Sequence, residues 1–224
     1  IHEMSNNITS LLSNVPPSHE IPFDVLQEIR KNGGGLLPSQ PISDKAENRT
    51  IEYASKKVMV RIFNTENPEF IYLHIHGGGH CIGASDMQDQ TLEKTSKDLN
   101  CAVVSVEYRL APKNPYPAAP DDCETAALWL VENSMKEFNT KKIIIGGESA
   151  GANLSAVTLQ RLKGKDMLEP FKGANLIYGS YDARLTPSTI QKKDSDEVFL
   201  LSFEMIKKFR NSYFQGNIDL SLPD

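Results

Sequence analysis

A serine flanked by glycines lies between a predicted strand and a predicted helix. The apolar run 143–145 precedes it and the helix-like stretch 153–162 follows, and the turn reads Gly147-Glu148-Ser149-Ala150-Gly151. A GxSxG sequence in this context is typical of a nucleophile elbow, in which a tight turn holds the serine hydroxyl out at the start of a helix. The two glycines let strand and helix approach without a Cβ clash. The pattern predicts that Ser149 attacks an acyl carbonyl.

A cluster of glycines follows another predicted strand. His76-Gly77-Gly78-Gly79-His80 comes directly after the apolar run 70–75. Consecutive glycines expose backbone N–H groups, and fixed N–H donors stabilise the negative charge that develops on a carbonyl oxygen during acyl transfer. Such a loop alone is a weak signal, but together with a downstream GxSxG it favours an oxyanion hole that also uses the N–H of Ala150.

The histidines do not follow the order expected for a serine nucleophile. After a nucleophile elbow, the acid and then the histidine come later in the chain. His74 lies within an apolar run, so we expect its side chain to be buried. His80 is on the oxyanion side of the serine, where proton transfer has poor geometry. We assign neither as the base, and all five histidines precede Ser149: His2, His19, His74, His76 and His80.

Other charged residues are interpreted as structural or left unassigned. Arg109 follows the predicted strand 102–106, and we expect it to form ion pairs with Glu107 and Asp122 that hold a proline-rich loop. A direct contact between Arg109 and substrate is the alternative. Asp182, Asp194, Asp196 and Asp219 follow Ser149, and none of these is assigned as its acidic partner.

Predicted strands alternate with predicted helices along most of the chain. This alternation indicates the α/β class, with a mostly parallel sheet covered on both faces and an active site at the carboxyl ends of the strands. A short amphipathic helix at 24–31 and a glycine-rich linker precede this body, and another helix at 202–213 follows it. The expected strands are 50–54 and 58–63 (a hairpin), 70–75, 102–106, 143–145 and 176–178, and the expected helices between them are 86–99, 121–138 and 153–162.

The composition is that of an ordinary globular protein. The 224 residues are 39% hydrophobic and 24% charged, with net charge −5. This balance argues against a nucleic-acid partner, since the short lysine pairs are scattered. No apolar run reaches the length of a membrane span and no signal peptide is visible. Cys81, Cys101 and Cys123 lack the spacing of a metal site, so we expect reduced thiols, no metal, no cofactor and a cytoplasmic location.

Three segments together carry a resemblance to a known family. The segments HGGGH, YRLAPKNPYPAAPDD and GGESAGAN resemble the hormone-sensitive-lipase family of α/β-hydrolases, also described as type IV esterases. The resemblance covers residue 50 to the end, with weaker echoes in TPST and in FLLSFEMIKKF. It implies Ser149 as nucleophile, His76 and Glu148 as residues that support the loops, and an oxyanion hole built from the N–H groups of Gly78, Gly79 and Ala150.

The resemblance also implies a domain organisation. Residues 1–45 correspond to an N-terminal helical cap, residues 46–224 to the α/β-hydrolase core, and 187–216 to part of the lid region. The family places its acid and its histidine beyond the point that Leu222-Pro223-Asp224 resembles. We therefore expect a truncated chain that lacks the last strands and helices together with the triad Asp and His, and that is inactive alone. Glu148 stands where the commoner family residue is Asp.

Three functions remain open. The first is a serine carboxylic-ester hydrolase that acts on small to medium acyl esters through an acyl-enzyme. The second is a non-catalytic receptor for a small molecule, as in the plant gibberellin receptors that resemble this family. The third is amide or peptide acyl transfer, since fold and serine turn do not separate esters from amides. The oligomeric state, including a homodimer, also stays open.

Overall fold

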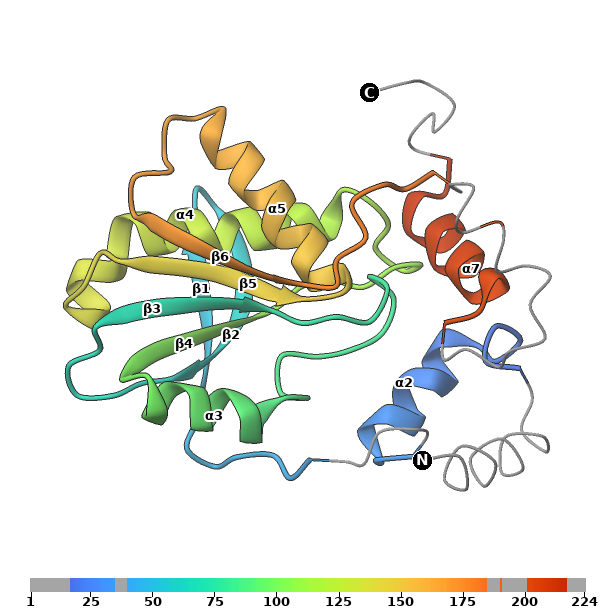
Figure 1. Cartoon of the computed structure of the whole chain (residues 1–224), viewed down its shortest axis with the longest axis horizontal. Helices are drawn as coiled ribbons and strands as arrows, with labels where there is room; N and C mark the ends of the chain where they lie inside the picture. Colours follow the sequence, from blue (N-terminus) through green and yellow to red (C-terminus); the bar gives the residue numbers. More distant parts are fainter. Residues whose placement is uncertain (1–16, 35–39, 185–189, 191–200, 217–224) are drawn as a thin grey trace.

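A six-stranded sheet forms the centre of the molecule. The computed structural model describes residues 17–34, 40–184, 190 and 201–216. The sheet order is β1-β2-β4-β3-β5-β6 (Figure 1). β1 and β2 form an antiparallel hairpin, β2 pairs antiparallel with β4, and the remaining neighbours are parallel. The predicted hairpin and mostly parallel sheet are confirmed. The strands are β1 (Glu47–Tyr53), β2 (Lys56–Phe63), β3 (Phe70–Ile75), β4 (Cys101–Glu107), β5 (Ile143–Glu148) and β6 (Phe171–Ile177).

Helices cover both faces of this sheet, as the alternation predicted. The helices α3 (Asp89–Asp98), α4 (Ala118–Phe138) and α5 (Ala150–Lys163) connect successive parallel strands. α4 and α5 lie on one face and α3 on the other (Figure 1). The side chains of β4 divide between the two layers. Val104 belongs to the cluster on the α4 and α5 side and Val103 to the smaller cluster that includes Leu92 of α3. Burial on both faces explains the unbroken apolar run in β4.

Several element bounds differ from the predictions. α4 and α5 begin at 118 and 150 rather than at 121 and 153, because a proline or glycine such as Pro120 or Gly151 is tolerated in a first helical turn. β5 continues to Glu148 because Gly146 and Gly147 pair with β3. The strand predicted at 176–178 was placed wrongly, since it is β6 at 171–177.

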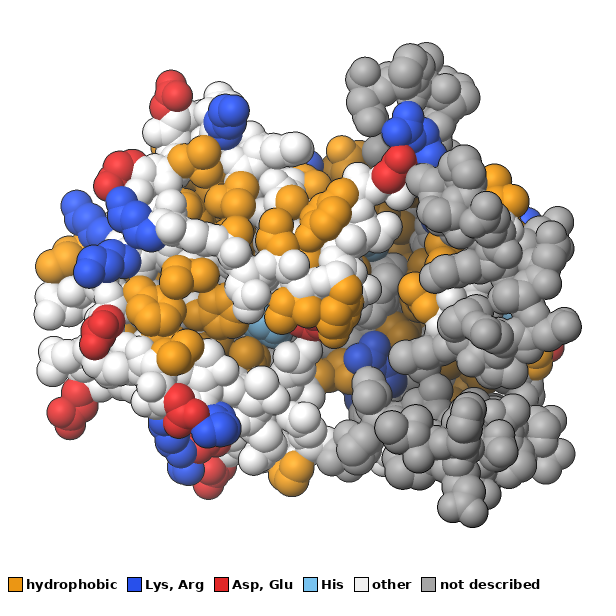
Figure 2. Space-filling model, in the orientation of Figure 1, with side chains coloured by type: hydrophobic (Ala, Val, Ile, Leu, Met, Phe, Trp, Pro, Cys, Tyr) orange, Lys and Arg blue, Asp and Glu red, His pale blue; other side chains and the backbone are white. Residues whose placement is uncertain are grey.

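β6 is one of the two outer strands of the sheet within the described residues, opposite β1. Most of its side chains are exposed, so no alternation of apolar and polar residues marks where it begins. Its carboxyl end carries exposed apolar side chains, Leu176 and Ile177, followed by Tyr178. Figure 2 shows hydrophobic side chains gathered in patches across the face on which β6 runs. Sequence alone located only the apolar end of this strand.

Two helices lie apart from the sheet, beyond the carboxyl ends of its parallel strands. They are α2 (Phe23–Lys31) and α7 (Phe203–Phe214), and they pack against each other (Figure 1). The rings of Phe23 and Phe209 stack with centroids 5.4 Å apart. The ammonium group of Lys208 lies 4.5 Å from the centroid of the Phe23 ring and donates a hydrogen bond to the carbonyl of Ile21. Both helices were predicted at nearly these bounds.

A buried ion pair fastens the segment before β1 to the core. The Arg61 Nε atom donates to Asp89 Oδ1 at 2.8 Å, and both side chains are buried. Another guanidinium nitrogen donates to the carbonyl of Ser43 at 2.6 Å, and the Ser43 N–H donates to Asp89 at 2.8 Å. The chain between α2 and the sheet is therefore anchored at residue 43.

Some predictions concern residues outside the described ranges. These include His2, Asp194, Asp196, Asp219 and the TPST segment at 186–189. The expected cap of 1–45 and lid of 187–216 fall only partly within the description, and both stay predictions. The three cysteines, Cys81, Cys101 and Cys123, are buried and unpaired, as expected.

Candidate active site

The serine turn, residues 147–151, joins β5 directly to α5. Ser149 has φ 55° and ψ −118°, which L-residues rarely adopt, and α5 begins at the next residue. Its N–H donates to the carbonyl of Ile177 at 2.9 Å. A Cβ on either Gly147 or Gly151 would overlap the carbonyl oxygen of Ile75. The predicted strand–turn–helix is confirmed, and the contact with Ile75 is the reason for both glycines.

The glycine loop, residues 76–83, lies beside this turn. β3 and β5 are parallel neighbours with Ile75 opposite Gly147, so the two loops leave the sheet at the same edge. A Cβ on Gly151 would also come within 2.7 Å of the carbonyl oxygen of His76. The expected meeting of the two motifs at one sheet edge is confirmed.

Three backbone N–H groups around Ser149 are available as donors. Among the described residues, the N–H groups of Gly78 and Gly79 have no hydrogen-bond acceptor. Gly78 (φ 117°) turns its carbonyl inward, where it accepts from the N–H groups of Cys81 and Ile82 at 3.1 and 3.0 Å. Ala150 is the first residue of α5, so its N–H belongs to the unsatisfied first turn of a helix. Donors of this kind can hold an oxyanion.

Glu148 ties the serine turn to the glycine loop. Its Oε1 accepts from the Gly77 N–H and from Gln88 Nε2, each at 2.6 Å, and Oε2 lies 3.4 Å from His74 Nε2. Burial alone would raise the pKa of Glu148. The hydrogen bond and electrostatic interaction with His74, together with the hydrogen bond from the Gly77 N–H, outweigh burial and lower this pKa. The carboxylate therefore stays ionised near neutral pH. Sequence analysis missed Gln88 and this contact of His74.

His76 braces the start of the glycine loop. Its Nδ1 lies 2.7 Å from the carbonyl oxygen of Gly77, so Nδ1 carries the proton and donates. The ring stacks on Tyr108 with centroids 4.1 Å apart, and the Tyr108 hydroxyl donates to the His76 carbonyl at 2.9 Å. Burial lowers the pKa of His76 to about 4, so the ring is neutral at pH 7.

The other two nearby histidines are also engaged within the fold. His74 is buried, as expected, and its Nδ1 lies 2.9 Å from the hydroxyl of Ser105. His80 stacks on Tyr213 of α7 with centroids 3.9 Å apart, and burial lowers its pKa to about 4. Within the described ranges, neither ring hydrogen-bonds to Ser149.

The predicted ion pair of Arg109 is confirmed for one partner only. Arg109 Nε and Nη2 donate to the buried carboxylate of Asp122 at 2.9 and 2.8 Å, and the Arg109 N–H also donates to it at 2.8 Å. The expectation for Glu107 was wrong, because Glu107 accepts from the N–H of Ser85 at 2.6 Å. The guanidinium thus holds the loop that follows β4.

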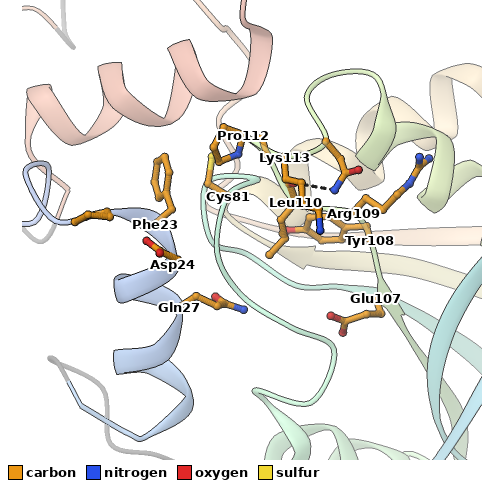
Figure 3. Close-up of a pocket in the computed structure, with 13 residues that line it drawn as sticks. Phe23, Asp24, Gln27, Cys81, Glu107, Tyr108, Arg109, Leu110, Pro112 and Lys113 are labelled. Atoms are coloured by element: carbon orange, nitrogen blue, oxygen red, sulfur yellow. Dashed lines mark hydrogen bonds between the residues drawn. The ribbon is translucent and has the colours of Figure 1, made fainter.

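A groove lies between α2 and this loop. Its volume is about 710 Å³, and residues 22–24, 27, 81 and 107–114 line it. Figure 3 shows Phe23 and Gln27 on the α2 side, facing Leu110 and Pro112. Ser149 is not among the residues that line this groove.

The described part of the chain contains neither a metal-binding cluster nor a membrane-spanning helix. No group of three or more His, Cys, Asp or Glu side chains there is arranged to hold a metal ion. None of the helices in those ranges has the length and apolar character needed to cross a membrane.

The chain is similar to known α/β-hydrolases in both sequence and structure. A family model for the alpha/beta hydrolase fold matches residues 72–223, which include both the glycine loop and the serine turn. The chain belongs to the α/β-hydrolase family. Its relatives place it in the hormone-sensitive-lipase-like branch, so the resemblance and the fold class predicted from sequence are confirmed.

Individual relatives are mostly esterases by name. Esterase LipI of Mycobacterium tuberculosis is 34% identical over 201 residues, which are 84% of this chain and 60% of LipI. Arylacetamide deacetylase of Rattus norvegicus is 32% identical over 152 residues, 65% of this chain and 38% of that protein. A Pyrobaculum calidifontis esterase structure matches with TM-score 0.78 and 26% identity, over 92% of this chain and 68% of that one. The chain thus spans less than two thirds of these two curated α/β-hydrolase relatives.

Proposed function

We propose that the whole protein is a serine carboxylic-ester hydrolase with Ser149 as its nucleophile. The observation that carries this proposal is the placement of Ser149 at a strained turn, beside three N–H donors that have no partner among the described residues: Gly78, Gly79 and Ala150. Relatives that are named as esterases support the same reaction class.

The reaction divides into two acyl transfers. Ser149 Oγ attacks the ester carbonyl carbon while a general base takes its proton, and the carbonyl electron pair moves to the oxygen that the N–H groups hold. Collapse of this intermediate breaks the bond to the alkoxide, which leaves with the proton. Water then attacks the carbonyl carbon of the acyl-enzyme in the same way, and the acid and the free Ser149 hydroxyl are released.

The general base comes from outside the described residues in this proposal. His74, His76 and His80 are committed to contacts within the fold, and burial lowers the pKa of the last two to about 4. All five histidines of this sequence precede Ser149. We propose that the triad histidine and its acid belong to a part of the whole protein that this sequence does not contain.

Residues 1–45 and 187–216 are proposed to cover the acyl pocket. α2 and α7 support this, because both stand beyond the carboxyl ends of β3 and β5, where the serine turn and the glycine loop lie (Figure 1). Their stacked rings, Phe23 and Phe209, offer apolar surface for a small to medium acyl chain. His76 and Glu148 act as supports of the glycine loop and not as reacting groups.

The test uses the full natural polypeptide and a p-nitrophenyl acyl ester. Ser149→Ala should lower the hydrolysis rate at least about a thousandfold, because removing the nucleophile leaves only the donors and binding. Ser134→Ala is the control, since this buried α4 hydroxyl has no hydrogen-bond partner among the described residues and should be dispensable. Undiminished hydrolysis by Ser149→Ala would contradict the proposal.

Amide hydrolysis is the second candidate. The similarity to a protein named arylacetamide deacetylase favours it, since that name denotes cleavage of an amide. The same serine turn serves either leaving group. Comparing kcat/KM for a p-nitrophenyl ester and the matching p-nitroanilide decides between them, and a larger value for the anilide would replace the ester assignment.

A further inference from the structure

We propose that Gln27 of α2 and Phe209 of α7 are positioning residues for the glycine loop, so that the oxyanion donors are correctly placed only when both helices are docked. This inference rests on the proposed function, because it concerns the donors that the reaction uses. It gives α2 and α7 a part in the chemistry beyond covering the pocket.

The first contact is a double hydrogen bond from α2. Gln27 Nε2 donates to the carbonyl of Gly83, and Gln27 Oε1 accepts from the N–H of Gly83, both at 2.7 Å. One side-chain amide thus satisfies both backbone groups of one residue. Figure 3 shows Gln27 reaching from α2 across toward the core. The pairing fixes Gly83 both in distance and in orientation.

Gly83 transmits this contact to the start of the loop. Its φ is 112°, and a Cβ on it would come within 2.6 Å of the Gly77 carbonyl oxygen and 2.8 Å of His76 Cε1. Gly83 therefore packs against the residues that precede the two donors. A displacement of Gln27 would therefore displace Gly83 and, through it, the neighbouring residues His76 and Gly77.

The second contact comes from α7. A Cβ on Gly79 would overlap the ring of Phe209, so this ring lies directly against the Gly79 backbone. The same ring stacks on Phe23 of α2, which joins the two helices at this point. Phe209 therefore bears directly on one of the two loop residues that offer an N–H donor.

The core holds the opposite flank of the loop. Glu148 accepts from the Gly77 N–H, Tyr108 donates to the His76 carbonyl, and the Ala111 N–H donates to the His80 carbonyl at 2.9 Å. The donors at 78 and 79 lie between these anchors and the two helices. Glycines with positive φ have many accessible conformations and do not hold one by themselves. A misplacement of a catalytic group by about 1 Å can lower the reaction rate about a hundredfold. The helix contacts therefore decide whether the donors are in place.

Kinetics of the full natural protein test the catalytic consequence. Gln27→Met should lower kcat for a p-nitrophenyl ester about 10- to 100-fold with KM changed less than threefold, because oxyanion donors act mainly in the transition state. Gln27→Glu keeps the acceptor for the Gly83 N–H and should recover part of the loss. Phe209→Leu should act in the same direction. Lys31→Gln, an exposed position on the same helix, is the matched control and should keep wild-type kcat.

A boronic acid separates positioning of the donors from general damage. Boronates form a tetrahedral adduct with an active-site serine and therefore report on the oxyanion hole. Affinity for butylboronic acid should fall in parallel with kcat in Gln27→Met, whereas affinity for the corresponding carboxamide should change less than threefold. Equal losses for both ligands would indicate a distorted pocket and overturn the inference.

Amide hydrogen exchange tests the coupling without any catalysis. Residues 77–83 should exchange faster in Gln27→Met and Phe209→Leu than in wild type, while β3 and β5 keep their protection. If both variants show wild-type exchange at residues 77–83 and a kcat within twofold of wild type, the inference is refuted, although the proposed function still stands. An inactive wild-type protein would instead contradict the proposed function and leave the exchange result to decide the coupling.

Discussion

At the scale of single residues, the geometry of the candidate site depends on side chains to which the proposed reaction gives no reacting role. Glu148 and His76 hold the backbone of the glycine loop through the Gly77 N–H and carbonyl. The positions of the two motifs after predicted strands predicted that the serine turn and the glycine loop meet at one edge of the sheet, as they do in the structure. They could not predict Gln88, Gln27 or the contact of His74 with Glu148, because those contacts join segments distant in sequence through ordinary polar residues.

A residue-scale prediction concerns pH. Burial lowers the pKa of His80 to about 4, against about 6.5 for an unfolded histidine. Below pH 6.5, His80 is therefore protonated in the unfolded chain but stays neutral in the folded protein. Protonation of the unfolded chain lowers the free energy of unfolding progressively as the pH falls from about 6.5 toward 4. Between pH 7 and pH 5 this loss is about 2 kcal/mol.

Chemical denaturation at the two pH values measures this effect. His80→Asn should show a pH 7 to pH 5 loss of unfolding free energy smaller than that of wild type by about 2 kcal/mol. Asn tolerates the positive φ of 63° at this position. An unchanged pH dependence in the variant would mean that His80 already binds its proton at pH 5 in the fold.

At the scale of elements, close approach of strand and helix dictates where glycine is needed. The apolar runs predicted β3 and β4 well, since buried strands differ sharply in composition from their surroundings. The sequence-based prediction placed β6 wrongly because its side chains are mostly exposed and show no alternation of apolar and polar residues. The same reasoning explains why β5 was predicted too short, since its last residues include two glycines that pair with β3.

Two glycine substitutions test this dependence. Gly151→Ala should lower the free energy of unfolding by about 3 kcal/mol, because its Cβ would overlap the Ile75 carbonyl and force the backbone to move. Gly173→Ala in β6 is the control, since a Cβ there meets nothing within 4 Å. It should be neutral or stabilise by up to about 1 kcal/mol. Equal unfolding midpoints for the two variants would show that the serine turn is not tightly packed.

At the scale of the whole molecule, polar contacts tie α2 and α7 to the loops at the strand ends. Gln27 of α2 hydrogen-bonds to Gly83, and the Tyr213 carbonyl of α7 accepts from the Tyr116 N–H at 2.8 Å. The buried group of Arg61, Asp89 and Ser43 instead anchors the segment between α2 and β1. The alternation of elements predicted the layered core. The placement of α2 and α7 over the strand ends came from the resemblance and not from any periodicity, because it depends on side-chain contacts between distant segments.

Breaking the buried anchor should cost more than breaking a surface pair. Asp89→Asn leaves the buried Arg61 guanidinium without its counter-charge and should destabilise the fold by about 3–5 kcal/mol. Asp98→Asn removes the exposed partner of Lys94 and should cost less than about 0.5 kcal/mol. Urea denaturation of the two variants gives the comparison, and similar losses would contradict the anchoring role.

The central claim is that Ser149 forms the acyl-enzyme. The most direct measurement is mass spectrometry of the full natural protein after reaction with an alkyl fluorophosphonate, which transfers its phosphonyl group to an activated serine and releases fluoride. We predict one adduct, located on the peptide that carries Ser149, with loss of ester hydrolysis in proportion to labelling. An adduct on another residue, or full hydrolytic activity in the labelled protein, would contradict it.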